Sequence, residues 1–158
     1  RQRQMCIRDR KEAINMAEQD RMEGLYQALV QRALEARESS YSPYSGFAVG
    51  AALLCADGTV YPGCNIECAS SSPTNCAERT AFFRAVSEGK REFLAIAVAG
   101  GPAGKSPEEF CPPCGVCRQV MAEFCGPDFE VLLTDGKSIQ KLTLKELFPY
   151  SFGKNNLG

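Results

Sequence analysis

The chain has 158 residues, a formal net charge of −1 and 44% hydrophobic residues. This length and composition favour one domain with a packed core, and the near-neutral charge gives no basic surface of the kind that binds nucleic acid. No apolar run is long enough to span a membrane, and no apolar signal core follows the charged first residues, so we expect a cytoplasmic protein. We therefore predict no membrane partner and no nucleic-acid partner.

Nine cysteines and no histidine narrow the possible chemistry. In a reducing compartment, cysteines bind metals or take part in catalysis more often than they form disulfides. The absence of histidine excludes Ser-His-Asp and Cys-His catalytic machinery, and it excludes zinc sites that contain a histidine ligand. Any zinc site in this chain must therefore use sulfur, with or without carboxylate.

The first residues differ from the rest of the chain. Residues 1–12 are charged and polar, and we interpret them as a disordered leader or as an extension that arose from gene prediction. A basic arm for nucleic acid is the alternative, but the segment has no aromatic residues to support it. Residues 13–158 are expected to form a single domain.

The remaining chain alternates between helical and strand-like patterns. Apolar spacing and helix start and stop signals predict helices over residues 22–37, 76–87, 114–124 and 144–148, with Asn75 as the N-cap of the second. Apolar runs predict strands over residues 47–55, 59–64, 93–99, 129–134 and 139–142.

Turn signals and the order of these elements predict how they are arranged. Asp57-Gly58 and Asp135-Gly136 predict two antiparallel hairpins. Strand–helix–strand occurs twice, which predicts two right-handed crossovers and parallel central strands. The expected fold class is α/β, a three-layer α/β/α arrangement with a mixed five-stranded sheet.

Two cysteine motifs could hold one metal ion. Cys114 and Cys117 form a C-x-x-C pair at the start of a predicted helix, and Cys76 starts another. Three protein ligands with one open position is the arrangement of a catalytic zinc site, whereas a structural site usually has four ligands. Glu78, two residues from Cys76, could then move protons instead of binding the metal. This is the three-cysteine pattern of zinc-dependent nucleobase deaminases. A structural-zinc binding module with Cys111 as fourth ligand is the alternative.

Residues 74–81 (TNCAERTA) and 113–119 (PCGVCRQ) resemble the small, homotetrameric cytidine deaminases. The resemblance extends to residues 41–50 (YSPYSGFAVG), 63–67 (GCNIE) and the region 146–153, and it covers nearly all of the chain after about Gly24. It implies zinc-dependent hydrolytic deamination of cytidine and deoxycytidine to uridine and deoxyuridine, with release of ammonia, in pyrimidine salvage. It also implies a zinc ion in each chain and a homotetramer whose sites are shared between subunits.

The resemblance implies roles for individual side chains around the metal. Cys76, Cys114 and Cys117 bind zinc, and Glu78 takes a proton from the activated water, protonates N3 and helps ammonia to leave. Arg79 donates hydrogen bonds to a ligand sulfur and offsets the charge of the three thiolates.

The resemblance also implies a set of substrate contacts. Asn65 and Glu67 match the pair that binds the ribose hydroxyls, and Phe47 matches an aromatic beside the pyrimidine. The backbone of Ala77 matches a hydrogen-bonding partner of the base. Phe152 matches an aromatic that reaches the base from a neighbouring subunit.

Two positions depart from the family pattern. Cys68 and Ser71 stand where the family commonly has asparagine and tyrosine. Because these side chains are smaller, the pocket could admit other substrates. The alternative substrates are modified, N4-substituted cytidines and blasticidin S.

Overall fold

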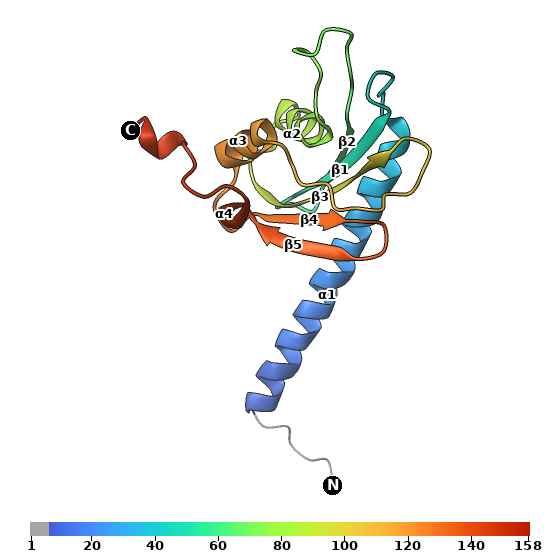
Figure 1. Cartoon of the computed structure of the whole chain (residues 1–158). Coiled ribbons are helices and arrows are strands. Elements are labelled where there is room, and N and C mark those ends of the chain that lie inside the picture. The colour runs from blue at the N-terminus through green and yellow to red at the C-terminus, as the bar shows by residue number, and fades with distance from the viewer. Residues whose placement is uncertain (1–6) are drawn as a thin grey trace.

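The computed structural model describes residues 7–158, and its centre is a five-stranded sheet with helices on both faces (Figure 1). The strands are β1 (Phe47–Cys55), β2 (Val60–Cys64), β3 (Phe93–Pro102), β4 (Glu130–Thr134) and β5 (Ile139–Thr143). The helices are α1 (Ile7–Ala36), α2 (Ala77–Ser87), α3 (Gly115–Phe124) and the short α4 (Leu144–Leu147), with 3-10 turns at Arg37–Ser39 and Lys154–Asn156. The predicted three-layer α/β class with a mixed five-stranded sheet is confirmed.

The order of the strands is β2-β1-β3-β4-β5. Strand β1 is antiparallel to both β2 and β3, β3 is parallel to β4, and β4 is antiparallel to β5. Both predicted hairpins are therefore present. The strands that helices connect, β2, β3 and β4, all run in the same direction, as predicted. The sequence did not predict that β1 would lie between β2 and β3 and run against both. The connection through α2 passes over β1, so β2 and β3 are not neighbours.

Each face of the sheet has its own core, because successive side chains of a strand point to opposite faces. On one face, Leu29 and Ala33 of α1 pack on alanines of β1 and β3, with Leu54 and Leu132 beside them. On the other face, α2 and α3 pack on larger residues of β1, β3 and β4, which include Leu53, Ile96, Val98 and Val131. The small residues on the first face allow α1 to lie close to the sheet.

Helix α1 is much longer than the apolar pattern predicts. It begins at Ile7 instead of Met22, and it therefore extends into the segment that we expected to be a disordered leader. Its first half projects away from the sheet (Figure 1). The described side chains between Arg8 and Leu25 are exposed, so this half has no apolar stripe to reveal a helix. Residues 1–6 of the expected leader lie outside the described residues.

A close contact between β2 and α2 fixes the start of that helix. A Cβ atom on Gly63 would lie 2.5 Å from the carbonyl oxygen of Ala77 and 2.6 Å from the nitrogen of Ala81. Only glycine permits this approach. Further along α2, Phe82 packs edge-on against Phe93 with ring centroids 5.1 Å apart. These contacts hold the first turn of α2 at the end of the sheet where β2 and β3 finish.

Candidate active site

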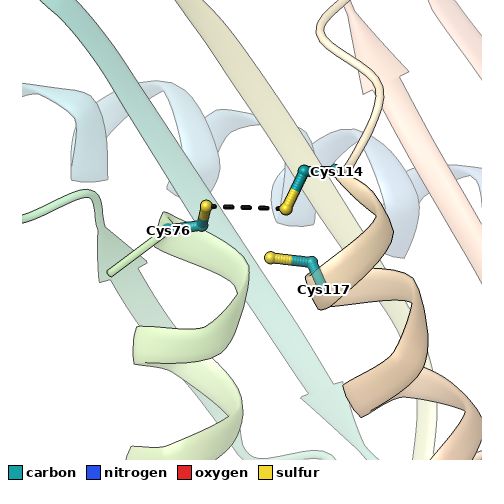
Figure 2. Close-up of side chains that lie close together, drawn as sticks. All are labelled: Cys76, Cys114 and Cys117. Atoms are coloured by element: carbon teal, nitrogen blue, oxygen red, sulfur yellow. Dashed lines mark hydrogen bonds between the residues drawn. The ribbon is translucent and has the colours of Figure 1, made fainter. Parts of the chain in front are cut away.

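Three cysteine thiols converge where α2 and α3 begin (Figure 2). Cys76 and Cys114 are the N-cap residues of the two helices, and Cys117 lies in the first turn of α3. The three Sγ atoms lie within 4.8 Å of one another, and those of Cys76 and Cys114 are 3.8 Å apart. Sulfur ligands of a tetrahedral zinc ion, with Zn–S bonds of about 2.3 Å, are separated by about 3.8 Å. The donor set and its spacing therefore fit zinc.

Within residues 7–158, the group of side chains close enough to hold an ion consists of these three cysteines, and Cys111 is not among them. The structure therefore does not support the four-sulfur structural site. Asn75, which we predicted as the N-cap of α2, is not the cap, because Cys76 takes that position. The Nδ2 atom of Asn75 donates to Oγ1 of Thr80 at 3.1 Å instead.

Hydrogen bonds favour ionisation of Cys76. The thiol of Cys117 donates to its sulfur, which lowers the pKa of Cys76 and raises that of Cys117. Arg79 lowers the pKa of Cys76 further, since its Nη2 donates to the Cys76 sulfur at 3.3 Å. The positive end of a helix adjoins both N-cap thiols and also favours thiolate. Metal-binding thiols need this stabilisation because they bind as thiolates.

Glu78 lies in the first turn of α2 with only 4% of its surface exposed. Burial raises the pKa of its carboxyl group to about 7, and the charge of Cys76 acts in the same direction. A carboxyl group with such a pKa can both accept and release a proton near neutrality. Glu78 is not one of the clustered metal-binding groups, which leaves it available for proton transfer.

Asn65 and Glu67 lie beside the amino end of β1, where they fasten the preceding loop. The Asn65 Nδ2 donates to the Phe47 carbonyl at 2.8 Å, and its Oδ1 accepts from the Val49 N–H at 2.9 Å. One Glu67 oxygen accepts the N–H groups of Tyr44 and Ser45, at 3.0 and 3.1 Å. The structure thus brings Phe47, Asn65 and Glu67 together at the end of the sheet where α2 begins.

The remaining predicted contacts fall in two different environments. Ala77 is fully buried at the start of α2, between the thiol of Cys76 and the carboxyl of Glu78 in sequence. Phe152 lies in the C-terminal tail with 58% of its surface exposed, and the tail extends away from the sheet (Figure 1). The carbonyl of Phe152 accepts from Nε2 of Gln119 on α3 at 2.8 Å. The two departures from the family pattern, Cys68 and Ser71, border a cavity of about 450 Å³ that Glu67 also lines.

Arg118 supports the turn that carries Cys114 and Cys117, a role that the sequence did not predict. Its Nε donates to the Pro113 carbonyl at 2.8 Å, and its Nη1 donates to the Leu147 carbonyl. The side chain therefore ties the residue before Cys114 to the end of α4. Its position next to Cys117 in the sequence was the available signal.

Comparisons with known proteins agree with this geometry. Residues 24–132 match the family described as the cytidine and deoxycytidylate deaminase zinc-binding region. A cytidine deaminase of Sporosarcina psychrophila is 52% identical over 130 residues, which cover 82% of this chain and 92% of the relative. One from Halalkalibacterium halodurans is 54% identical over 127 residues, covering 80% and 92%.

Solved structures show the same relationship. The crystal structure of cytidine deaminase from Burkholderia pseudomallei superposes with a TM-score of 0.73 at 47% sequence identity, and the match covers 80% of this chain and 98% of that one. The match to the family model extends over Cys76, Glu78, Cys114 and Cys117, which are the residues that form the thiol cluster and its buried acid. The chain therefore belongs to the cytidine and deoxycytidylate deaminase family.

Proposed function

We propose that this protein catalyses the hydrolytic deamination of cytidine and deoxycytidine to uridine and deoxyuridine, with release of ammonia. The observation that carries the proposal is the cluster of three thiols beside Glu78, a carboxylate that is buried but is not a ligand. The identity to cytidine deaminases over most of the chain supports the same activity. We assign the activity to the domain over residues 13–158.

Cys76, Cys114 and Cys117 would hold one zinc ion in each chain. The zinc ion, when bound, acts as a Lewis acid that makes a water molecule a better nucleophile. Glu78 takes the proton of the attacking water and delivers it to N3 of the cytosine ring, and it later helps the amine to leave as ammonia. Arg79, hydrogen-bonded to the sulfur of Cys76, offsets part of the thiolate charge.

We also propose the substrate contacts that the family resemblance implies. Asn65 and Glu67 bind the ribose hydroxyls, Phe47 lies beside the pyrimidine, and the Ala77 backbone hydrogen-bonds to the base. The ring of Phe47 supports this role, because 41% of its surface is exposed at the end of the sheet where α2 begins. The cavity beside Glu67 leaves space next to the proposed ribose site.

We infer that the protein is a homotetramer in which Phe152 reaches the site of a neighbouring subunit. The extended tail and the exposed ring of Phe152 support this arrangement. Among residues 7–158, no helix is both long and apolar enough to cross a membrane. The described cysteines are free, which supports a cytoplasmic enzyme, and the net charge of −1 supports a nucleoside substrate over a nucleic acid.

An ultraviolet assay of Glu78→Gln tests the proposal. The glutamine keeps the shape of Glu78 but cannot accept the proton, so kcat for cytidine should fall by about 10²–10⁴. Zinc content and the thermal midpoint should stay close to those of the wild type. Normal turnover in this variant would refute the role of Glu78. N4-methylcytidine and blasticidin S are assayed in parallel, and a wild-type kcat/KM higher for either than for cytidine and deoxycytidine would reject the proposed substrate.

A further inference from the structure

We propose that Cys111 is a specificity-determining residue that forms the wall of the base pocket at the 4-amino end of the cytosine ring. Its side chain limits the size of the group that N4 can carry. The inference rests on the proposed function, and it adds a residue that the three-thiol site does not use. Cys111 is half-buried and is a free thiol.

Cys111 lies directly over the backbone of β3. A Cβ atom on Gly100 would be 2.6 Å from Sγ of Cys111 and 2.9 Å from its Cβ. The same Cβ would be 3.1 Å from Cε1 of Phe47. The absence of a side chain on Gly100 therefore provides the space in which Cys111 and the ring of Phe47 lie close together.

The alternation of side chains along the strands shows which face of the sheet this group occupies. Ile96 and Val98 on β3 point to the face covered by α2 and α3, so position 100 points to that face too. On β1, Ala51 and Leu53 point to the same face, which places Phe47 there as well. Cys111 and Phe47 are therefore on the side of the sheet that carries the three metal-binding thiols.

Cys111 also lies close to the catalytic end of this face. It packs on Gly100 near the end of β3, and this is the end of the sheet at which α2 begins with Cys76 and Glu78. In the proposed reaction Glu78 faces N3, and the metal side faces C4. A side chain that lies close to Phe47 at this end of the sheet therefore borders the space in which the amino group on C4 must lie and through which it must leave.

Hydrogen bonds from Arg37 hold the backbone near Cys111 and should limit how far the space can expand. Arg37 donates from Nε to the Ala48 carbonyl at 3.0 Å and from Nη2 to the carbonyls of Pro102 and Lys105, at 3.2 and 3.1 Å. These hydrogen bonds tie the start of β1 to the end of β3 and to the loop that leads to Cys111. A change of side-chain volume at position 111 should therefore change the pocket itself.

The test compares cytidine with N4-methylcytidine, whose hydrolysis consumes water and yields uridine and methylamine. Both rates are measured as kcat/KM in wild type, Cys111→Ala and Cys111→Val. One methyl group in a hydrophobic pocket changes kcat/KM by about 10-fold or more. Cys111→Ala should therefore raise the ratio of N4-methylcytidine to cytidine about 10-fold, and Cys111→Val should lower it by a similar factor.

Two further variants separate pocket size from other effects. Cys111→Ser has nearly the volume of cysteine and should keep the wild-type ratio. Cys125→Ala removes another half-buried thiol, which lies at the far end of α3, and should also keep the wild-type ratio. Zinc content is measured for each variant, and it should not change.

The possible results are distinct. A ratio within twofold of wild type in both Cys111→Ala and Cys111→Val, with zinc retained, would overturn the role of Cys111 and leave the deaminase function intact. A wild-type protein that deaminates cytidine but not N4-methylcytidine, together with a measurable rate in Cys111→Ala, would support the role. A zinc-loaded wild type that is inactive on both nucleosides would reject the proposed function.

Discussion

Replacing Gly63 by alanine should disturb both the stability and the activity of the protein. The new Cβ would meet the Ala77 oxygen at 2.5 Å and the Ala81 nitrogen at 2.6 Å, and both are backbone atoms that no rotamer change can move aside. To reach an ordinary contact distance, the start of α2 must move away from β2 by roughly 1 Å. Overpacking of this kind costs about 1–3 kcal/mol, which corresponds to a fall in Tm of about 2–12 °C for a chain of this length.

The same movement should reduce catalysis, because Cys76 and Glu78 lie at the displaced end of α2. A misplacement of about 1 Å can cost about 100-fold in rate. Thermal melts by circular dichroism and kcat/KM for cytidine are measured at one protein concentration with zinc in excess.

Gly24→Ala is the matched control. Gly24 lies in the exposed part of α1, and a Cβ there would meet nothing within 4 Å. Alanine should stabilise that helix by about 0.5–1 kcal/mol and leave activity unchanged. If Gly63→Ala melts at or above the wild-type temperature with full activity, the close contact between β2 and α2 does not fix the site.

Three further results are expected. Removal of zinc with a chelator should expose Cys76 and Cys114 to iodoacetamide, whereas bound zinc should protect them, and peptide mass spectrometry measures the labelling. Equal labelling with and without zinc would contradict the ligand assignment. Arg79→Gln should lower kcat more than it lowers zinc content. In metal-free protein it should also raise the pKa of Cys76 and so slow the alkylation of this thiol at pH 6. An unchanged alkylation rate would exclude the effect of Arg79 on Cys76. Burial raises the pKa of Cys125 to about 12, so the folded chain keeps a proton that the unfolded chain releases above about 8.5. The stability that this protonated thiol contributes is complete below pH 8.5 and decreases as pH rises towards 12. The urea midpoint of wild type should therefore fall faster between pH 8 and 10 than that of Cys125→Ala. Parallel curves for the two proteins would refute this.

The strands and the ligand-bearing helices could be predicted because their signals are local. Each buried strand is a short apolar run between turn residues, and Gly89 and Pro113 mark where α2 ends and where α3 is about to begin. The first half of α1 could not be predicted in this way. Its side chains face solvent, so helix propensity and ion pairs such as Arg8 with Glu12, 3.2 Å apart, favour the helix without any apolar period.

The order of the strands depends on contacts that are distant in sequence. Nothing in the residues of β1 shows that it will insert between β2 and β3. Its small residues become informative only once α1 is known to cover them, because a Cβ atom on Gly50 would overlap the Ala33 carbonyl oxygen. The same limit applies to Asn75, whose capping ability was visible but whose actual partner, Thr80, depends on where the helix starts.

The proposed metal ligands could be identified from the sequence because the spacing of Cys114 and Cys117 is itself typical of metal binding, and the structure brings these cysteines together with Cys76. The proposed substrate residues are different, since Asn65 and Glu67 have structural roles that the sequence does not reveal. Both side chains hold the loop before β1 through hydrogen bonds to backbone groups. The proposed ribose site and the stability of this loop therefore depend on the same atoms. Loss of activity on replacing either residue cannot by itself identify a ribose contact. Only a rise in KM with an unchanged melting temperature separates recognition of the sugar from support of the loop.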